Sequence, residues 1–151
     1  MTSKLRVDSI LPVDGAPTNG GGGIIQVQMG TLTDRFNTSS STMVDTGLSV
    51  SITPKFSTSK ILVNVSLGSL ANSSAKRRAF MTIVRDSTNV IVGDADTGDE
   101  VTAAVCPRSD DDSHTQIPVS FMVLDSPATT SAITYKVQIS RGPDATGTVY
   151  L

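Results

Sequence analysis

The chain contains no tryptophan, one cysteine and one histidine, and aromatic residues make up only 4% of it. With Cys106 alone, no internal disulfide can form. His114 follows Ser113 and the run Asp110-Asp111-Asp112. Neighbours in a polar loop do not form a triad, which needs a nucleophile, a base and an orienting group brought together in space. A thiol dyad of Cys106 with His114 has no supporting motif either. The sequence therefore predicts that the protein is not an enzyme.

Charged residues are also few, at 17%, and the net charge is −2. A protein that binds nucleic acid presents a basic face to the phosphates. The only basic cluster of the sequence is Lys76-Arg77-Arg78, which we interpret as a solvated turn. No apolar run approaches the roughly 20 residues of a membrane-spanning helix, and the first six residues lack the apolar core of a signal peptide. We therefore expect no nucleic acid, no membrane and no cofactor as a partner, and synthesis in a cytoplasm.

What the sequence does contain is a sharp boundary at residues 20–23, which are four consecutive glycines. Such a run has high backbone entropy and no side chains to pack, so we predict a hinge. Residues 1–19 before it are predicted to form an extended N-terminal arm, because Pro12 and Pro17 exclude a continuous helix. Residues 24–151 after it are predicted to form one β-sandwich domain. The arm is too short to bury its own apolar side chains, which we expect to bind a partner: Leu5, Val7, Ile10 and Leu11.

Apolar and polar residues alternate along several stretches after the hinge, as they do in half-buried strands. The strongest stripe, predicted to be core, is Ile61, Val63, Val65 and Leu67. Other predicted strands cover residues 24–29, 48–53, 80–85, 89–92, 101–105, 117–124, 135–140 and 148–151. A turn at residues 86–89 joins two of them as a hairpin. About eight short strands separated by turns predict an all-β fold, an antiparallel β-sandwich of jelly-roll type.

An acidic stretch at residues 94–100 is the one candidate for metal binding. Asp94, Asp96 and Asp99 offer carboxylate oxygens, the ligands that calcium prefers, and Gly98 permits a turn. The spacing departs from the twelve-residue calcium loop, which needs its glycine one position later and a glutamate at the end. We therefore predict solvated acidic turns and no bound metal, with a cation loop at these three aspartates as the alternative.

Several motifs resemble those of a known group of proteins. Residues 3–10 (SKLRVDSI), followed by Asp14-Gly15, resemble the N-terminal arm of small virion structural proteins of cyanophages and other aquatic bacteriophages. Residues 46–54 (TGLSVSITP), 59–63 (SKILV) and 124–132 (LDSPATTSA) are similar to the β domain of the same proteins. The resemblance implies a phage structural protein with a jelly-roll-like domain.

Two functions fit this resemblance. The first is a capsid decoration, or cement, protein that binds the major capsid protein or another virion protein through the arm and stabilises the capsid surface. The resemblance, together with a chain that ends within a predicted strand at Leu151, leads us to expect a homotrimer with subunits meeting along sheet faces. The second is a tail-fibre or adhesion module that recognises a host receptor or glycan, although the absence of tryptophan disfavours stacking on sugars. Either function places the protein in the virion, on the capsid surface or in the tail.

Overall fold

The structure is a computed structural model of the chain, in which residues 24–74, 77–91, 116–141 and 146–151 are described. These residues form eight β-strands and no helix, so the predicted all-β class is confirmed for this part of the chain. The strands are β1 (Asn37–Thr38), β2 (Val44–Ile52), β3 (Ile61–Asn72), β4 (Ala79–Arg85), β5 (Thr88–Asn89), β6 (Ile117–Asp125), β7 (Ile133–Arg141) and β8 (Val149–Tyr150).

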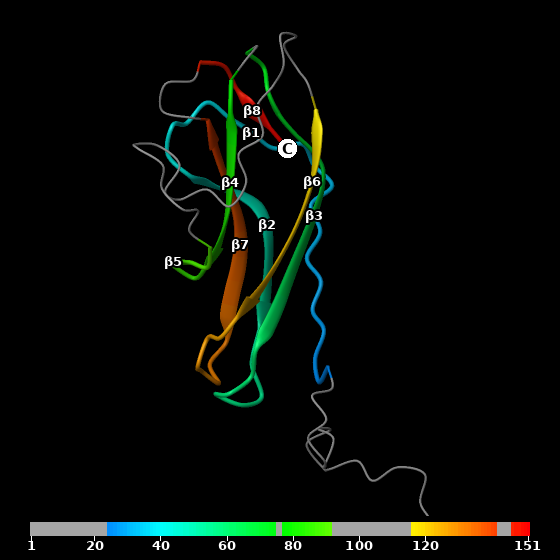
Figure 1. Cartoon of the computed structure of the whole chain (residues 1–151), viewed down its shortest axis with the longest axis vertical. Coiled ribbons are helices and arrows are strands. Elements are labelled where there is room, and N and C mark those ends of the chain that lie inside the picture. The colour runs from blue at the N-terminus through cyan, green and yellow to red at the C-terminus, as the bar shows by residue number, and fades with distance from the viewer. Residues whose placement is uncertain (1–23, 75–76, 92–115, 142–145) are drawn as a thin grey trace, which may run out of the picture.

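The strands form two four-stranded antiparallel sheets that pack as a β-sandwich (Figure 1). One sheet has the order β1-β8-β3-β6, and the other has the order β2-β7-β4-β5. The first strand pairs with the last, the second with the seventh, the third with the sixth, and the fourth with the fifth. Pairing of β3 with β8 and of β4 with β7 completes the two sheets. The pairing is therefore nested, from the outermost pair of strands to the innermost.

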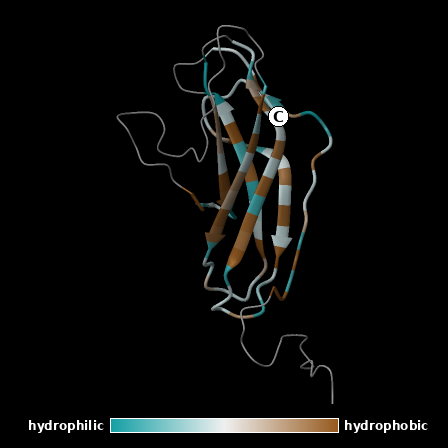
Figure 2. Cartoon of the chain, turned by 45° about the vertical axis from the view of Figure 1, so that its right-hand side comes forward, coloured by the Kyte–Doolittle hydropathy of each residue, from teal (hydrophilic) through white to brown (hydrophobic). Residues whose placement is uncertain are grey.

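The core lies between the sheets, and alternation along the strands builds it. Figure 2 shows apolar and polar residues alternating along the long strands, and along most of β2, β3 and β7 the more buried positions alternate with more exposed ones. The predicted stripe is confirmed, since Val63, Val65 and Leu67 are buried and Ile61 is packed against them. The most deeply buried apolar side chains of the core are Leu70, Met81, Ile83, Ile139 and Val149.

A bulge in β2 shows how local sequence serves this packing. The register of β2 against β7 shifts between Asp45 and Ser49, at a point where Gly47 has a φ of 90°, in the left-handed region that favours glycine. The shift leaves a carbonyl of β7 without its ladder partner. The hydroxyl of Thr46, which is buried, donates a hydrogen bond of 2.9 Å to the carbonyl oxygen of Val137 and so satisfies it.

The prediction of a strand at residues 24–29 is wrong. These residues have no ladder partner among the described residues, and Ile24, Val27 and Met29 are 84%, 76% and 84% exposed. The alternation correctly marks a stretch suited to a strand, but it says nothing of which strand pairs with it. We call residues 24–29 the exposed stretch.

Two other predicted strands are shorter than expected. The hairpin at residues 86–89 is confirmed, with Asp86 in the left-handed region at a φ of 53°, but its second strand is only Thr88–Asn89. Val90 still donates a hydrogen bond of 2.9 Å to the carbonyl oxygen of Ile83, so the chain stays beside β4. The last strand is Val149–Tyr150. The strand predicted at residues 101–105 lies outside the described residues.

Candidate functional site: a groove between the sheets

The residues that the sequence singles out for binding or chemistry all lie outside the described residues. They are Leu5, Val7, Ile10 and Leu11 of the arm, Asp94, Asp96 and Asp99 of the acidic stretch, and Cys106 and His114. Among the residues that the structure does describe, no three His, Cys, Asp or Glu side chains are grouped so that they could hold a metal. The same part of the chain contains no helix that could cross a membrane. We therefore looked for a candidate site among the grooves and exposed edges of the described sandwich.

A groove of about 690 Å³ opens where two strands of one sheet, β1 and β8, are much shorter than the strands of the other sheet that face them. β1 and β8 have two residues each, whereas β2 and β7, in the opposite sheet, have nine each. Beyond β1 and β8, toward the lower end of Figure 1, no described strand lies between the flanking residues 28–35 and β3. The groove is lined by Gln28, Met29, Gly30, Thr31, Leu32, Thr33, Asp34, Arg35, Leu48, Ser49, Val50, Val63, Asn64, Val65, Ser66, Leu67, Gly68, Ser69, Ile83, Gln116, Tyr135, Lys136, Val137 and Leu151.

One wall of the groove is formed by residues 28–35, which we call the flanking segment. At Gly30 this segment approaches β2 so closely that a Cβ atom would overlap the carbonyl oxygen of Ser49. At its other end the Arg35 guanidinium lies 4.2 Å from the centroid of the Tyr150 ring, a cation–π contact with β8. The chain is then held by paired hydrogen bonds between the backbones of Phe36 and Leu151, of 2.9 and 3.3 Å. The flanking segment is therefore fixed to both sheets.

The opposite wall is the edge of β3 that faces β8. On its other edge β3 pairs with β6 from Ile61 to Leu70. On the groove edge it pairs with β8 at Ala71 and Asn72 alone, so within the described residues the N–H and C=O groups of residues 61–70 on this edge have no ladder partner. Such an edge is a template for another strand.

The floor of the groove is apolar. Val63, Val65, Tyr135 and Val137 are buried there, while Leu48 and Val50 of β2 are only half-buried. Half-burial at inward-facing positions means that the core is incompletely covered on this side. Two backbone walls over an apolar floor suit an extended peptide with apolar side chains on one face, rather than a small polar substrate.

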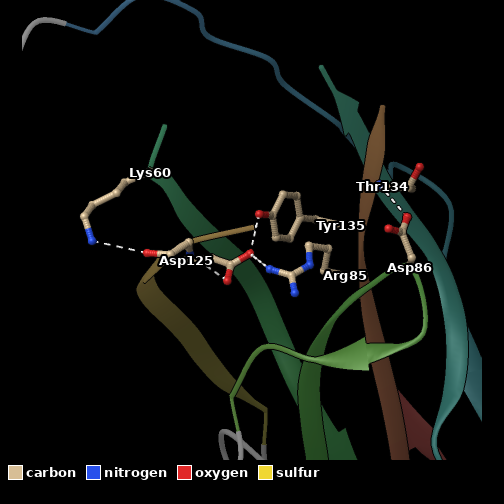
Figure 3. A network of polar contacts seen from close by, with 7 residues as sticks. Lys60, Arg85, Asp86, Asp125, Thr134 and Tyr135 are labelled. Carbon is tan, nitrogen blue, oxygen red and sulfur yellow. Dashed lines mark hydrogen bonds and ion pairs between the residues drawn. The ribbon is translucent and has the colours of Figure 1, made fainter. Parts of the chain in front are cut away.

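A polar network ties the two sheets together where β3 begins and β6 ends (Figure 3). The carboxylate of Asp125, on β6, accepts hydrogen bonds of 2.5 Å from the Arg85 guanidinium and 2.6 Å from the Tyr135 hydroxyl, both from the opposite sheet. The Asp125 carboxylate also accepts a hydrogen bond of 2.8 Å from the backbone N–H of Ser126. The Ser126 hydroxyl in turn accepts a hydrogen bond of 3.2 Å from the Lys60 ammonium group. Nearby, the Asp86 side chain accepts a hydrogen bond from the Thr134 backbone.

The pKa shifts in this network indicate a structural tie. Burial raises the pKa of Asp125, but hydrogen bonds from Tyr135 and Arg85 outweigh it and hold the pKa below its usual range. Burial, followed by the bond to Asp125, raises the pKa of Tyr135, and the same carboxylate raises the pKa of Arg85. A general acid or base works best with a pKa near the operating pH, and all three shifts lead away from neutrality. The network is therefore not suited to proton transfer.

Apart from Phe56, which is 46% exposed, the exposed large apolar side chains of the described residues lie in two places. One is the exposed stretch. The other, on the outer face of β3 and β6, is Leu62, Met122 and Leu124, which are 59%, 62% and 58% exposed and which we call the outer patch. Leu62 and Leu124 are direct cross-strand partners, and Met122 stands opposite Asn64, so the three side chains lie on adjacent positions of one face.

The sequence carries a signal for the outer patch but none for the groove. Phe121, Met122, Val123 and Leu124 are four consecutive apolar residues in a strand whose neighbours alternate. Both faces of β6 are therefore apolar at this end. The groove results from the lengths of β1 and β8 relative to β2 and β7, and strand pairing far apart in the sequence decides these lengths.

No model of a known protein family matches the chain, and neither a curated protein nor a solved structure is significantly similar to it. The function is therefore argued from the geometry and from the motifs of the sequence.

Proposed function

We propose that the protein is a structural protein of a phage particle, a capsid decoration protein that acts as a homotrimer and carries out no catalysis. The observation that carries this proposal is the exposed apolar surface on two parts of one small domain. A monomeric protein rarely exposes large contiguous apolar patches, and such patches mark sites of protein association. The outer patch is a sheet face on which subunits can meet.

The strand order supports a jelly-roll topology for the domain. A jelly roll is an eight-stranded antiparallel ribbon folded into two sheets, a frequent architecture of viral capsid domains. Here strand one pairs with eight, two with seven, three with six and four with five. This is the pairing that folding one ribbon produces. The topology agrees with the motifs that resemble phage virion proteins.

The arm is the second part of the proposal. Leu5, Val7, Ile10 and Leu11 are apolar groups on residues 1–19 that bind another virion protein. Burying each side chain fully on a partner yields roughly 1.5 to 3 kcal/mol, against about 1 to 2 kcal/mol for ordering each backbone residue. One arm therefore binds weakly, and a trimer with three arms binds through high effective concentration.

The test is the location and copy number of the protein in particles of the phage that encodes it. We expect hundreds of copies per particle, measured by quantitative mass spectrometry against the major capsid protein, and density on the capsid surface in electron micrographs. A few tens of copies at the tail would favour the tail-fibre or adhesion module instead. Absence from purified particles would overturn both. Sedimentation of the isolated protein tests the trimer separately.

A further inference from the structure

We propose that the groove is a docking slot for a β-strand, and that its occupant is residues 4–11 from the arm of a second copy of the chain. This rests on the proposed function, in which the arm binds a virion protein and the subunits form a homotrimer, and it takes the arm's partner to be a neighbouring copy of this chain rather than a different virion protein. Each subunit would complete the sandwich of its neighbour by donating one strand, a form of β-strand addition.

The backbone of the groove walls can accept a strand. Residues 61–70 of β3 present an edge without a ladder partner among the described residues, on the side that faces the groove. β1 and β3 both run antiparallel to β8, their common neighbour. A strand that enters the groove in line with β8 therefore runs antiparallel to β3 on one side and to the flanking segment on the other. It can then extend the ladder that β8 begins.

Length and side-chain pattern select residues 4–11 of the chain. Eight residues in extended conformation span about 26 Å, and residues 61–70 of the β3 edge span about 33 Å, so the segment fits within the length of the edge. Alternation places Leu5, Val7, Ser9 and Leu11 on one face and Lys4, Arg6, Asp8 and Ile10 on the other. The first face suits the apolar floor formed by Val50, Val65 and Val137. The second face carries three charges and suits solvent, with Ile10 at its end as the one apolar residue that this arrangement does not bury in the groove. Pro12 ends the strand just after Leu11, since proline cannot donate to a ladder.

The course of the chain favours a second copy over the subunit's own arm. The exposed stretch follows the arm and overlaps the start of the flanking segment at residues 28 and 29. It runs along the side of the sandwich (Figures 1 and 2), and its side chains Ile24, Val27 and Met29 are exposed to solvent. Return of the arm to its own groove would leave these three side chains uncovered. Passage to a neighbouring subunit brings a second sandwich against them.

The experiment is photo-crosslinking of the full-length protein from the arm. A photo-reactive amino acid is placed at Ser9, on the face that would contact the floor. Unlabelled and ¹⁵N-labelled protein are mixed in equal amounts by co-refolding and irradiated, and the crosslinked peptides are identified by mass spectrometry. We expect crosslinks to peptides that contain Val50, Val65 or Val137, with light–heavy pairs as frequent as same-label pairs.

Matched variants test the face of the arm that enters. Val7→Asp puts a charge against the apolar floor, and we expect groove crosslinks to fall about tenfold or more. Arg6→Asp, one residue away on the solvent face, should leave them unchanged. Both substitutions lie outside the sandwich, so the fold of the domain is not at stake.

Each other outcome overturns the proposal. Same-label crosslinks alone would show that the arm occupies its own groove. Crosslinks that avoid the groove, or that respond equally to Val7→Asp and Arg6→Asp, would show that the slot does not hold this strand. Neither result bears on whether the protein is found on the capsid, which the copy number decides independently.

Discussion

Replacing Asp125 by alanine tests whether the polar network holds the two sheets together. The substitution removes the acceptor of hydrogen bonds from Arg85 and Tyr135, which come from the opposite sheet. Hydrogen bonds to a charged group contribute roughly 1.5 to 3 kcal/mol each, and a buried donor left without an acceptor costs about 1 to 3 kcal/mol. The Tyr135 residue is only 3% exposed, so its hydroxyl would be left without water. Because the contributions are not additive, we expect the free energy of unfolding to fall by about 3 kcal/mol.

Asp45→Ala is the matched control. The Asp45 carboxylate likewise accepts two hydrogen bonds, of 2.8 Å from Lys136 and 2.6 Å from Gln138. Its side chain is 48% exposed, whereas that of Asp125 is 13% exposed. Exposed ion pairs contribute about 0 to 1 kcal/mol. Urea unfolding of both variants at neutral pH should therefore separate them by roughly 2 kcal/mol. Equal stabilities would refute the reasoning that burial of the network makes it strong.

The same network predicts a dependence on pH. The pKa of Asp125 in the folded protein is lowered from its ordinary value of 3.8. A group with a depressed folded pKa stabilises the protein above its unfolded pKa, and this stability is lost as the pH falls through the folded value. We therefore expect the difference between the wild type and Asp125→Asn to be constant from neutral pH down to about 5, and to shrink below about 4.

Three further outcomes are expected. Tyr135→Phe should cost only about 1 kcal/mol in urea unfolding, because it removes a donor while Asp125 keeps its other partners. Val65→Asp places an unpaired charge in the core and should give insoluble or unfolded protein, whereas Ser66→Asp, on the exposed face of β3, should remain soluble with a near-normal melting temperature. Gly30→Val should loosen the flanking segment, because its Cβ overlaps the Ser49 carbonyl; unchanged proteolysis at residues 28–35 would contradict this contact.

Local alternation was sufficient to predict the long strands. β2, β3, β6 and β7 follow stretches in which apolar and polar residues alternate, and the inward face of β3 is the predicted stripe. Where the prediction was wrong, at residues 24–29, the alternation was equally clear. The difference is the partner: a strand exists only when another edge supplies its hydrogen bonds, and a local pattern holds no information about that edge.

The candidate site was less predictable for the same reason. The residues singled out for binding were apolar groups of the arm and carboxylates of the acidic stretch, each recognisable from a short run of sequence. The groove depends on β8 being two residues long beside a β3 of twelve, and residues 72 and 149 must pair before that mismatch exists. No window of sequence contains both strands. The groove can therefore be recognised only once the pairing of β3 with β8 is known.

The proposed arm exchange would explain both the exposed stretch, which was predicted to be a strand, and the groove beside β3. Within the described residues, the exposed stretch alternates like a strand but has no ladder partner, and one edge of β3 also has no ladder partner. These are two places where the sandwich lacks a neighbouring strand. A sandwich with both is poorly suited to remain a monomer, because edges and exposed apolar side chains promote association. In the arrangement proposed above, association of copies through the arm would remove both defects at once, because the donated strand would cover the floor and the neighbouring sandwich would cover the exposed stretch. The geometry that makes the isolated domain incomplete is thus the geometry that a subunit of a larger assembly needs.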